Sequence, residues 1–316
     1  MLNRRHLRVK VLQSLYAYHQ SHSGDIKQHE KNLLQSIDKV YEMYIWMLSL
    51  LSEVVAYAAN DAQERANKHL PTAEDLNADV KILENRFILS LNNNKEFLTG
   101  LKKYKVDWDF EPELIKSLFI ILKKSEEYKE YLKKSGDTLH SDKDIIKFIF
   151  KKVILKSSLA EQVFEDMFIY WPVDKDVLQA LIAKTFKNFA YDEPAQNKLA
   201  EVTGNWEEDR EFIVNLFEES IRHNDEYQVM IGSKTQNWEP DRIAMMDTLL
   251  MKMAIAEFIN FTSIPVKVTI NEYLEISKEF STPKSNSFIN GILDKILFEL
   301  KDQKKIGKIG RGLIDE

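Results

Sequence analysis

Apolar residues recur at steps of three and four along most of this chain, which is the spacing of an amphipathic α-helix. Between residues 3 and 19, one sector of a helical wheel holds Leu7, Val11, Leu12, Leu15 and Tyr18. The same pattern fills residues 25–70, where neither glycine nor proline occurs. We therefore expect a helix over the first range, and one long helix or two joined helices over the second.

The remainder of the chain repeats this pattern in shorter segments. Its spacing predicts helices over 74–91, 112–132, 142–170, 174–189, 207–230, 240–258, 265–276 and 283–300. Prolines at 112, 240, 265 and 283 are each expected in the first turn, and Thr282 is the expected cap of the last helix. Only 9 glycines and 7 prolines interrupt 316 residues, and strand-rich folds need more turns than that. The predicted fold class is all-α.

Charge is unevenly distributed. The formal net charge of −6 argues against a uniformly basic nucleic-acid coat. The first 24 residues nevertheless contain Arg4, Arg5, Arg8 and Lys10 and no acidic residue. Cations at a helix N-terminus conflict with the helix dipole, and a phosphate partner would remove that conflict. The alternative is a basic end that is simply solvated.

Several function classes are not expected from this sequence. The chain has no cysteine, which excludes disulfides and thiolate chemistry. His19, His22 and His29 lack further ligands at useful spacing, so no metal site is expected. No phosphate-binding loop, dinucleotide fingerprint or nucleophile elbow occurs, so we expect neither an enzyme nor a cofactor. The most apolar stretch, 43–59, is too short for a membrane span, so a soluble cytoplasmic protein is expected.

Two segments carry a more specific pattern. Residues 4–18, RRHLRVKVLQSLYAY, join an arginine-rich start to Leu12, Gln13, Leu15 and Tyr16. The second segment, 238–300, keeps in order Trp238, Arg242-Ile243, Asp247, Ala254, Glu257, Ile264-Pro265, Ile270-Asn271-Glu272 and the run 288–295, FINGILDK. In order and spacing these residues resemble the NusB family of bacterial transcription antitermination factors. Leu7 and Val9 depart from the family pattern, which has alanine and glutamate there.

The resemblance implies a discontinuous organisation. It covers residues 1–40 and 205–300, which would form a NusB-like RNA-binding fold of helical bundles. Residues 41–204 would be a large helical insertion, and residues 301–316 a flexible basic tail. Within the insertion, the lysine-rich stretch 147–156 could be a second RNA face or a solvated helix side.

The resemblance also implies a function. NusB proteins bind the boxA element of ribosomal RNA leaders together with NusE, a small-subunit ribosomal protein. The complex supports ribosomal RNA transcription by helping RNA polymerase resist termination, alongside NusA and NusG. The alternative is a helical protein-interaction scaffold that retains the fold without specific RNA binding. A NusB-like module fused to a methyltransferase is disfavoured, because no G-x-G-rich cofactor domain is present.

Site residues follow from the matching positions. The residues expected to contact RNA are Arg4, Arg5, His6, Arg8, Lys10, Phe288 and Asn290. The arginines would bind phosphates, Phe288 would stack on a base unless it is a core residue, and Asn290 would meet a base edge.

Tyr16 and Asp247 match positions that face NusE. The alternatives are burial for Tyr16 and a solvated helix charge for Asp247. Glu257 and Asn271-Glu272 are expected to make polar contacts between helices, and residues 207–209 to form a solvated acidic helix start.

Overall fold

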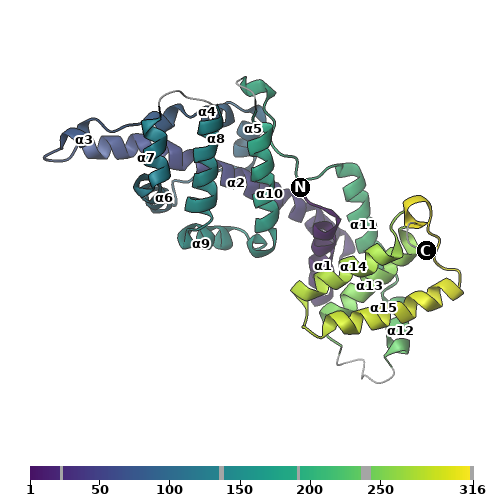
Figure 1. Cartoon of the computed structure of the whole chain (residues 1–316). Helices are drawn as coiled ribbons and strands as arrows, with labels where there is room; N and C mark the ends of the chain where they lie inside the picture. The colour runs from purple at the N-terminus through teal and green to yellow at the C-terminus, as the bar shows by residue number, and fades with distance from the viewer. Residues whose placement is uncertain (22–23, 135–138, 191–192, 236–242, 314–316) are drawn as a thin grey trace. The chain divides into compact units, whose positions relative to one another are not determined.

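Every regular element in the described part of this protein is helical. The structure is a computed structural model that describes residues 1–21, 24–134, 139–190, 193–235 and 243–313 (Figure 1). Over these ranges it contains α-helices, short 3-10 turns and one π-helix, and no strand. The predicted all-α class is confirmed. Nowhere in these ranges is a helix both long and apolar enough to cross a membrane.

The chain forms two compact units, each with its own internal packing. The central unit comprises Met1 and Asp38–Val202, and the terminal unit comprises Leu2–Ile37 and Thr203–Glu316. The terminal unit is therefore assembled from both ends of the chain. Its assignment as the NusB-like part, with the central unit as an insertion, stays a prediction.

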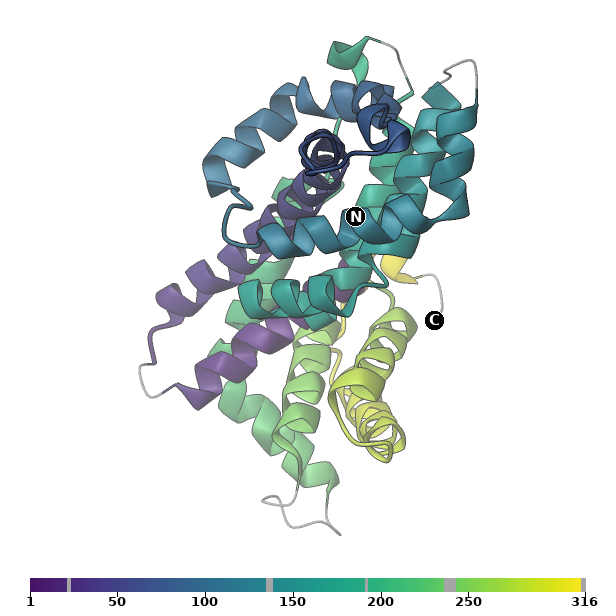
Figure 2. The ribbon, with the colours of Figure 1, turned by 90° about the vertical axis from the view of Figure 1, so that its left-hand side faces the viewer.

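One helix, α2, belongs to both units. It runs without a break from Ile26 to Ala66 (Figures 1 and 2). The absence of glycine and proline allows this length. Of the two predictions for 25–70, one long helix or two joined helices, the structure has the single helix. The stretch from Met43 to Leu51 is buried at every position, so this apolar segment is the core helix of the central unit.

Apart from α10, the other helices of the central unit are shorter than the periodicity predicts. They are α3 (Ala73–Leu76), η1 (Lys81–Glu84), α4 (Arg86–Asn92), α5 (Lys95–Tyr104), α6 (Pro112–Lys124), α7 (Glu126–Lys133), α8 (Leu139–Phe148), η2 (Ile149–Ile154), α9 (Ser158–Met167), α10 (Trp171–Asn188) and η3 (Pro194–Gln196). The single helices predicted over 74–91, 112–132 and 142–170 are wrong. Asn85, Ser125 and Ser157 each cap a new helix with a side-chain oxygen, which divides the longer pattern.

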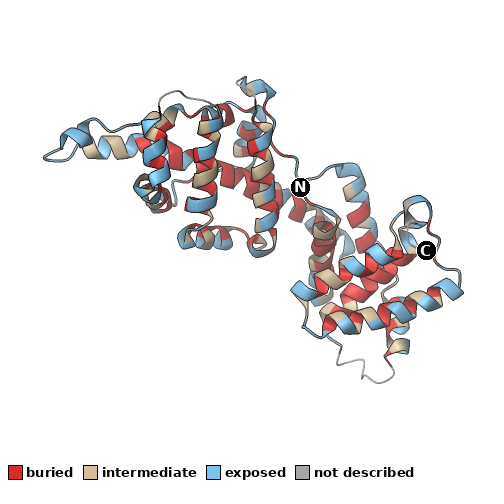
Figure 3. Ribbon diagram, in the orientation of Figure 1, coloured by how far each residue is buried: buried red, intermediate tan, exposed pale blue. Residues whose placement is uncertain are grey.

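The terminal unit packs around one buried helix. It contains α1 (Arg4–Gln20), the start of α2, α11 (Trp206–Arg222), α12 (Asn224–Lys234), α13 (Met245–Asn260), α14 (Val266–Phe280), α15 (Ser285–Asp302) and η5 (Gly310–Leu313). Helix α13 is buried from Leu249 to Phe258 and contacts α1, α11, α12, α14 and α15 (Figure 3). A helix that is apolar all round must be surrounded by others, and this one is.

Three predicted boundaries in the terminal unit need correction. His223 separates α11 from α12, where one helix over 207–230 was predicted. Helix α13 begins at Met245, and Pro240 lies outside the described residues. Helix α15 begins at Ser285, so Pro283 precedes it, and the Thr282 hydroxyl bonds the Ser285 side chain instead of capping the backbone.

The segment after α15 is anchored to the terminal unit. Lys308 is buried, and its Nζ donates to the carbonyls of Glu257 (3.2 Å) and Phe261 (2.8 Å). The next amide, Ile309 N–H, donates to Thr262 O at 3.1 Å. These bonds satisfy carbonyls at the C-terminal end of α13, which need donors. Flexibility of the whole tail stays a prediction, but Lys308 is not one of its solvated cations.

Candidate functional site

The arginine-rich start of α1 is fixed by a capping box. Asn3 Oδ1 accepts a hydrogen bond from the His6 backbone N–H at 3.0 Å, and His6 Nδ1 accepts from the Asn3 N–H at 3.3 Å. Reciprocal bonds of this kind satisfy two of the free N–H groups at a helix start. The His6 ring therefore has a structural task, beside its predicted contact with RNA.

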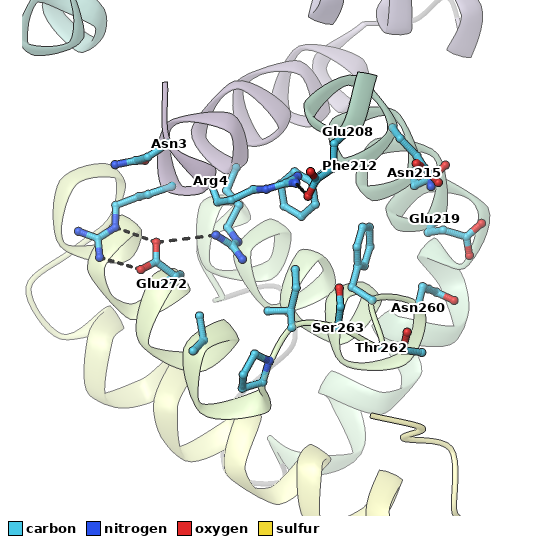
Figure 4. Close-up of a pocket in the computed structure, with 17 residues that line it drawn as sticks. Asn3, Arg4, Glu208, Phe212, Asn215, Glu219, Asn260, Thr262, Ser263 and Glu272 are labelled. Atoms are coloured by element: carbon cyan, nitrogen blue, oxygen red, sulfur yellow. Dashed lines mark hydrogen bonds and ion pairs between the residues drawn. The ribbon is translucent and has the colours of Figure 1, made fainter. Parts of the chain in front are cut away.

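The two outer arginines of α1 meet carboxylates from other helices. Arg5 Nε and Nη2 donate to the two oxygens of Glu272, each at 2.9 Å (Figure 4). Arg4 Nη2 lies 2.7 Å from Glu208 Oε1 and 3.7 Å from Asp209 Oδ1. These acids offset the conflict between the cations and the helix dipole. Both side chains stay partly accessible, 34% for Arg4 and 41% for Arg5.

Arg8 has a different environment. Its side chain is 2% exposed, and its Nε and Nη2 donate to both oxygens of the fully buried Glu257 at 2.8 and 2.7 Å. Glu257 also accepts from Thr269 Oγ1 at 2.7 Å and from Tyr273 Oη at 3.2 Å. Burial alone would lower the pKa of Arg8, but the carboxylate more than offsets this and raises it. Arg8 therefore stays charged inside the core.

Two of the predicted phosphate contacts are corrected by this burial. Arg8 borders the same open cavity as Arg4 and Arg5, but its side chain is almost fully buried and its guanidinium is paired with Glu257. Lys10 is also buried, with only 1% of its surface exposed. The pattern of cations suggested a solvent-facing row, but Arg8 and Lys10 lie against other helices. The interhelical polar contacts predicted for Glu257 and Glu272 are confirmed.

Arg4 and Arg5 lie at an open cavity in the terminal unit. Its volume is about 1260 Å³, and its walls come from α1, α11, α14 and residues 260–265 (Figure 4). The guanidinium carbon of Arg4 lies 4.4 Å from the centre of the Phe212 ring, a cation–π distance. The cavity thus combines cations, carboxylates and aromatic surface, which are groups that can meet phosphates and bases.

The remaining predicted contacts lie elsewhere in the same unit. Phe288 and Asn290 are half-buried on α15, and neither lines the cavity. Asn290 Nδ2 donates to Asp294 Oδ2 at 3.4 Å on its own helix. Tyr16, on α1, is 40% exposed, so it can meet a partner and its alternative of burial is wrong.

Asp247 is buried, contrary to both of its predicted settings. Its Oδ2 accepts from Ser285 Oγ at 2.7 Å, and its Oδ1 accepts from the Ser281 hydroxyl. The carboxylate therefore secures the start of α15, where negative charge is favourable. It is neither a solvated helix charge nor a side chain presented to a partner.

Some residues of the site were not predicted. Glu208 and Asp209 were expected to be solvated, but they pair with Arg4, and Phe212 follows one turn later on α11. The sequence does contain a signal for this pairing, because the first turn of α11 is acidic and the start of α1 has an excess of cations. Among the residues that the structure describes, no group of histidines and carboxylates could hold a metal ion. His22 lies outside them.

The fold and the cavity define an all-helical protein with an arginine-bearing, partly aromatic site on a bundle made from both chain ends. The sequence model of the NusB family matches residues 175–298. This range begins within α10 of the central unit and does not include α1. No solved structure matches the chain.

Three relatives carry the name transcription antitermination protein NusB. The one from Salinibacter ruber is 43% identical over 105 residues, 33% of this chain and 66% of the relative. That from Chloroherpeton thalassium is 41% identical over 106 residues, 34% and 50% of the two chains. That from Koribacter versatilis is 38% identical over 99 residues, 31% and 68%. The chain belongs to the NusB family. The matched segments span between half and about two thirds of these relatives.

Proposed function

We propose that this protein is a non-enzymatic transcription antitermination factor that binds boxA-type RNA of ribosomal RNA leaders together with NusE. The relatives' shared name supports the antitermination role. The RNA contact would be made by Arg4 and Arg5 at the cavity, with Tyr16 on the partner-facing side. The complex would act on RNA polymerase alongside NusA and NusG.

The observation that carries this proposal is the accessibility of Arg4 and Arg5 beside aromatic surface. Both guanidinium groups are held in place by carboxylates, so a phosphate would displace or share an existing ion pair. Arginine suits such exchange because its planar fork binds carboxylates and phosphates in the same bidentate way. RNA binding should therefore depend on salt and on the competing acids.

The test is binding of a boxA-like RNA, with and without NusE, across a salt series. The variant is Arg4→Gln/Arg5→Gln. Its matched control, Lys27→Gln/Lys31→Gln, removes two exposed cations from α2 in the same unit. For two lost phosphate contacts on single-stranded RNA, the slope of log affinity against log salt should fall by about 1.4. The control should keep most of the wild-type slope.

A second variant tests the competition directly. Glu208→Gln removes the closest acid from Arg4 without touching the arginine, and Glu208 is largely exposed. We expect it to tighten RNA binding, whereas a purely structural ion pair predicts no gain. The scaffold alternative predicts that wild type and the arginine variant both lack salt-dependent RNA binding, with or without NusE.

A further inference from the structure

The central unit carries a second concentration of positive charge. Between Asp144 and Glu161 the chain has no acidic residue and four lysines, at 147, 151, 152 and 156. The last three are exposed, and none of them has a carboxylate partner in the part of the chain that the structure describes. Lys147 is paired with Asp144 at 3.0 Å.

The π-helix η2 sets the direction of these lysines. In an α-helix, a step of five residues rotates a side chain by roughly 140° away from the starting face. Here Leu155 N–H bonds Phe150 O, five residues earlier, at 3.0 Å. Each turn therefore takes more residues, and Lys156 returns to the face that carries Lys151. Both line one cavity of about 490 Å³. Single π turns inside helices are frequent at functional sites.

Helix α10 adds a third cation to this cavity. Lys175 of α10 lines it and lies 2.8 Å from Glu161, the one acidic residue among the described residues that line the cavity. Three lysines and one glutamate leave a net positive charge. The unbalanced positive charge is therefore confined to η2, the residues directly after it and the facing lysine of α10.

We propose that the lysine cluster, defined as Lys151, Lys156 and Lys175 of this cavity and the exposed Lys152 next to Lys151, binds backbone phosphates of single-stranded RNA that flanks the specifically recognised element. This inference rests on the proposed function and gives the central unit a role in it. Lysine is a donor-only point charge, which suits phosphates and reads no base. The cluster would add affinity without sequence preference.

The composition of the cavity favours RNA over an acidic protein. Besides its charged groups, it is lined by Gln179, Leu155, Ala180 and Ala183, and by the buried Phe150. Protein interfaces usually centre on large aromatic or arginine anchors, and no exposed residue of that kind lines this cavity. A repeating anionic backbone requires only cations in a row.

The experiment compares two RNAs on the full-length protein with NusE present. One is a boxA-like RNA, and the other carries an unstructured extension of about 16 nucleotides on either side, enough to occupy a basic groove. The variant is Lys151→Gln/Lys152→Gln/Lys156→Gln. The control, Lys102→Gln/Lys124→Gln/Lys133→Gln, removes the same charge from three other helices of the central unit, where these lysines are also exposed.

We expect wild type and control to bind the extended RNA more tightly than the short one, with a steeper salt dependence. The variant should bind the short RNA normally and lose most of the gain from the extension, with a salt slope lower by about 2. Equal affinities of the wild type for both RNAs, or a full gain in the variant, would overturn the proposal and leave an acidic protein as the partner to seek. Failure to bind the short RNA would instead count against the proposed function.

Discussion

The buried pair between Arg8 and Glu257 should be the most sensitive point of the terminal unit. Arg8→Met keeps an unbranched apolar stem and removes the guanidinium group with its charge. It leaves Glu257, which has no exposed surface, without its two guanidinium bonds. Breaking a buried ion pair from one side costs about 3–5 kcal/mol, a change of more than a hundredfold in the folding equilibrium. Thr269 and Tyr273 still donate to the carboxylate, which favours the lower end of this range.

The assay must resolve the two units, because a protein with two units does not unfold in a single two-state step. We would follow hydrogen exchange at increasing urea and compare peptides from α1, α13 and α14 with peptides from the central unit. Protection should fall in the first set and stay unchanged in the second. Arg222→Met, which removes an exposed arginine paired with Glu219, is the control and should cost less than about 1 kcal/mol.

The double variant Arg8→Met/Glu257→Met decides whether the loss comes from an unpaired charge. With both charges removed, the loss should be clearly smaller than the sum of the two single losses. A loss below about 1 kcal/mol for Arg8→Met, or losses that simply add, would show that the pair does not stabilise the unit as argued.

Three further predictions concern single positions. Gly100→Ala would place its Cβ 2.7 Å from Cδ1 of the buried Ile45, so hydrogen exchange of the central unit should show a loss of about 1–3 kcal/mol. Combined with Ile45→Ala, the total loss should be smaller than the sum of the two single losses. Tyr44→Phe leaves the Ala200 N–H, which donates to the Tyr44 hydroxyl at 3.0 Å, without an acceptor, and should cost the central unit about 1–3 kcal/mol by hydrogen exchange. Burial lowers the pKa of Lys308 from 10.5 to about 8, so the folded state binds fewer protons than the unfolded state between these pH values. The free energy of unfolding should therefore rise with pH across that window. The Tm of wild type should increase relative to the Tm of Lys308→Met as the pH is raised from 8 to 10.5. A difference in Tm that stays constant with pH would contradict this.

Periodicity predicted the helical class and the helical pattern over 25–70 because both are local properties, but it left one long helix or two joined helices open there. The same pattern missed the breaks at Asn85 and Ser157. There the flanking apolar spacing stays helical, and only a side-chain cap divides the segment. Capping by asparagine or serine competes with helix continuation, and tertiary contacts decide which one occurs.

The candidate site was only partly predictable. The charge pattern of the sequence identified the cations at the start of α1. It could not distinguish the accessible Arg4 and Arg5 from the buried Arg8. Their difference is set by Glu257 and Glu272, which lie about 250 residues further along the chain. Family resemblance supplied the residue types at these positions without their exposure. Exposure depends on packing, and for Asp247 it changed the expected role altogether.

Because the terminal unit is made from both ends of the chain, its helices are synthesised at different times. Helix α1 is synthesised first, yet it packs mainly on α11, α13 and α14, the earliest of which begins at Trp206. At roughly 5–20 residues per second, the wait on the ribosome is on the order of ten to forty seconds. During that time the start of α2 can contact α1, through Tyr18 and His29, but the charge of Arg8 lacks Glu257. The central unit can complete its core meanwhile, so the terminal unit must fold last.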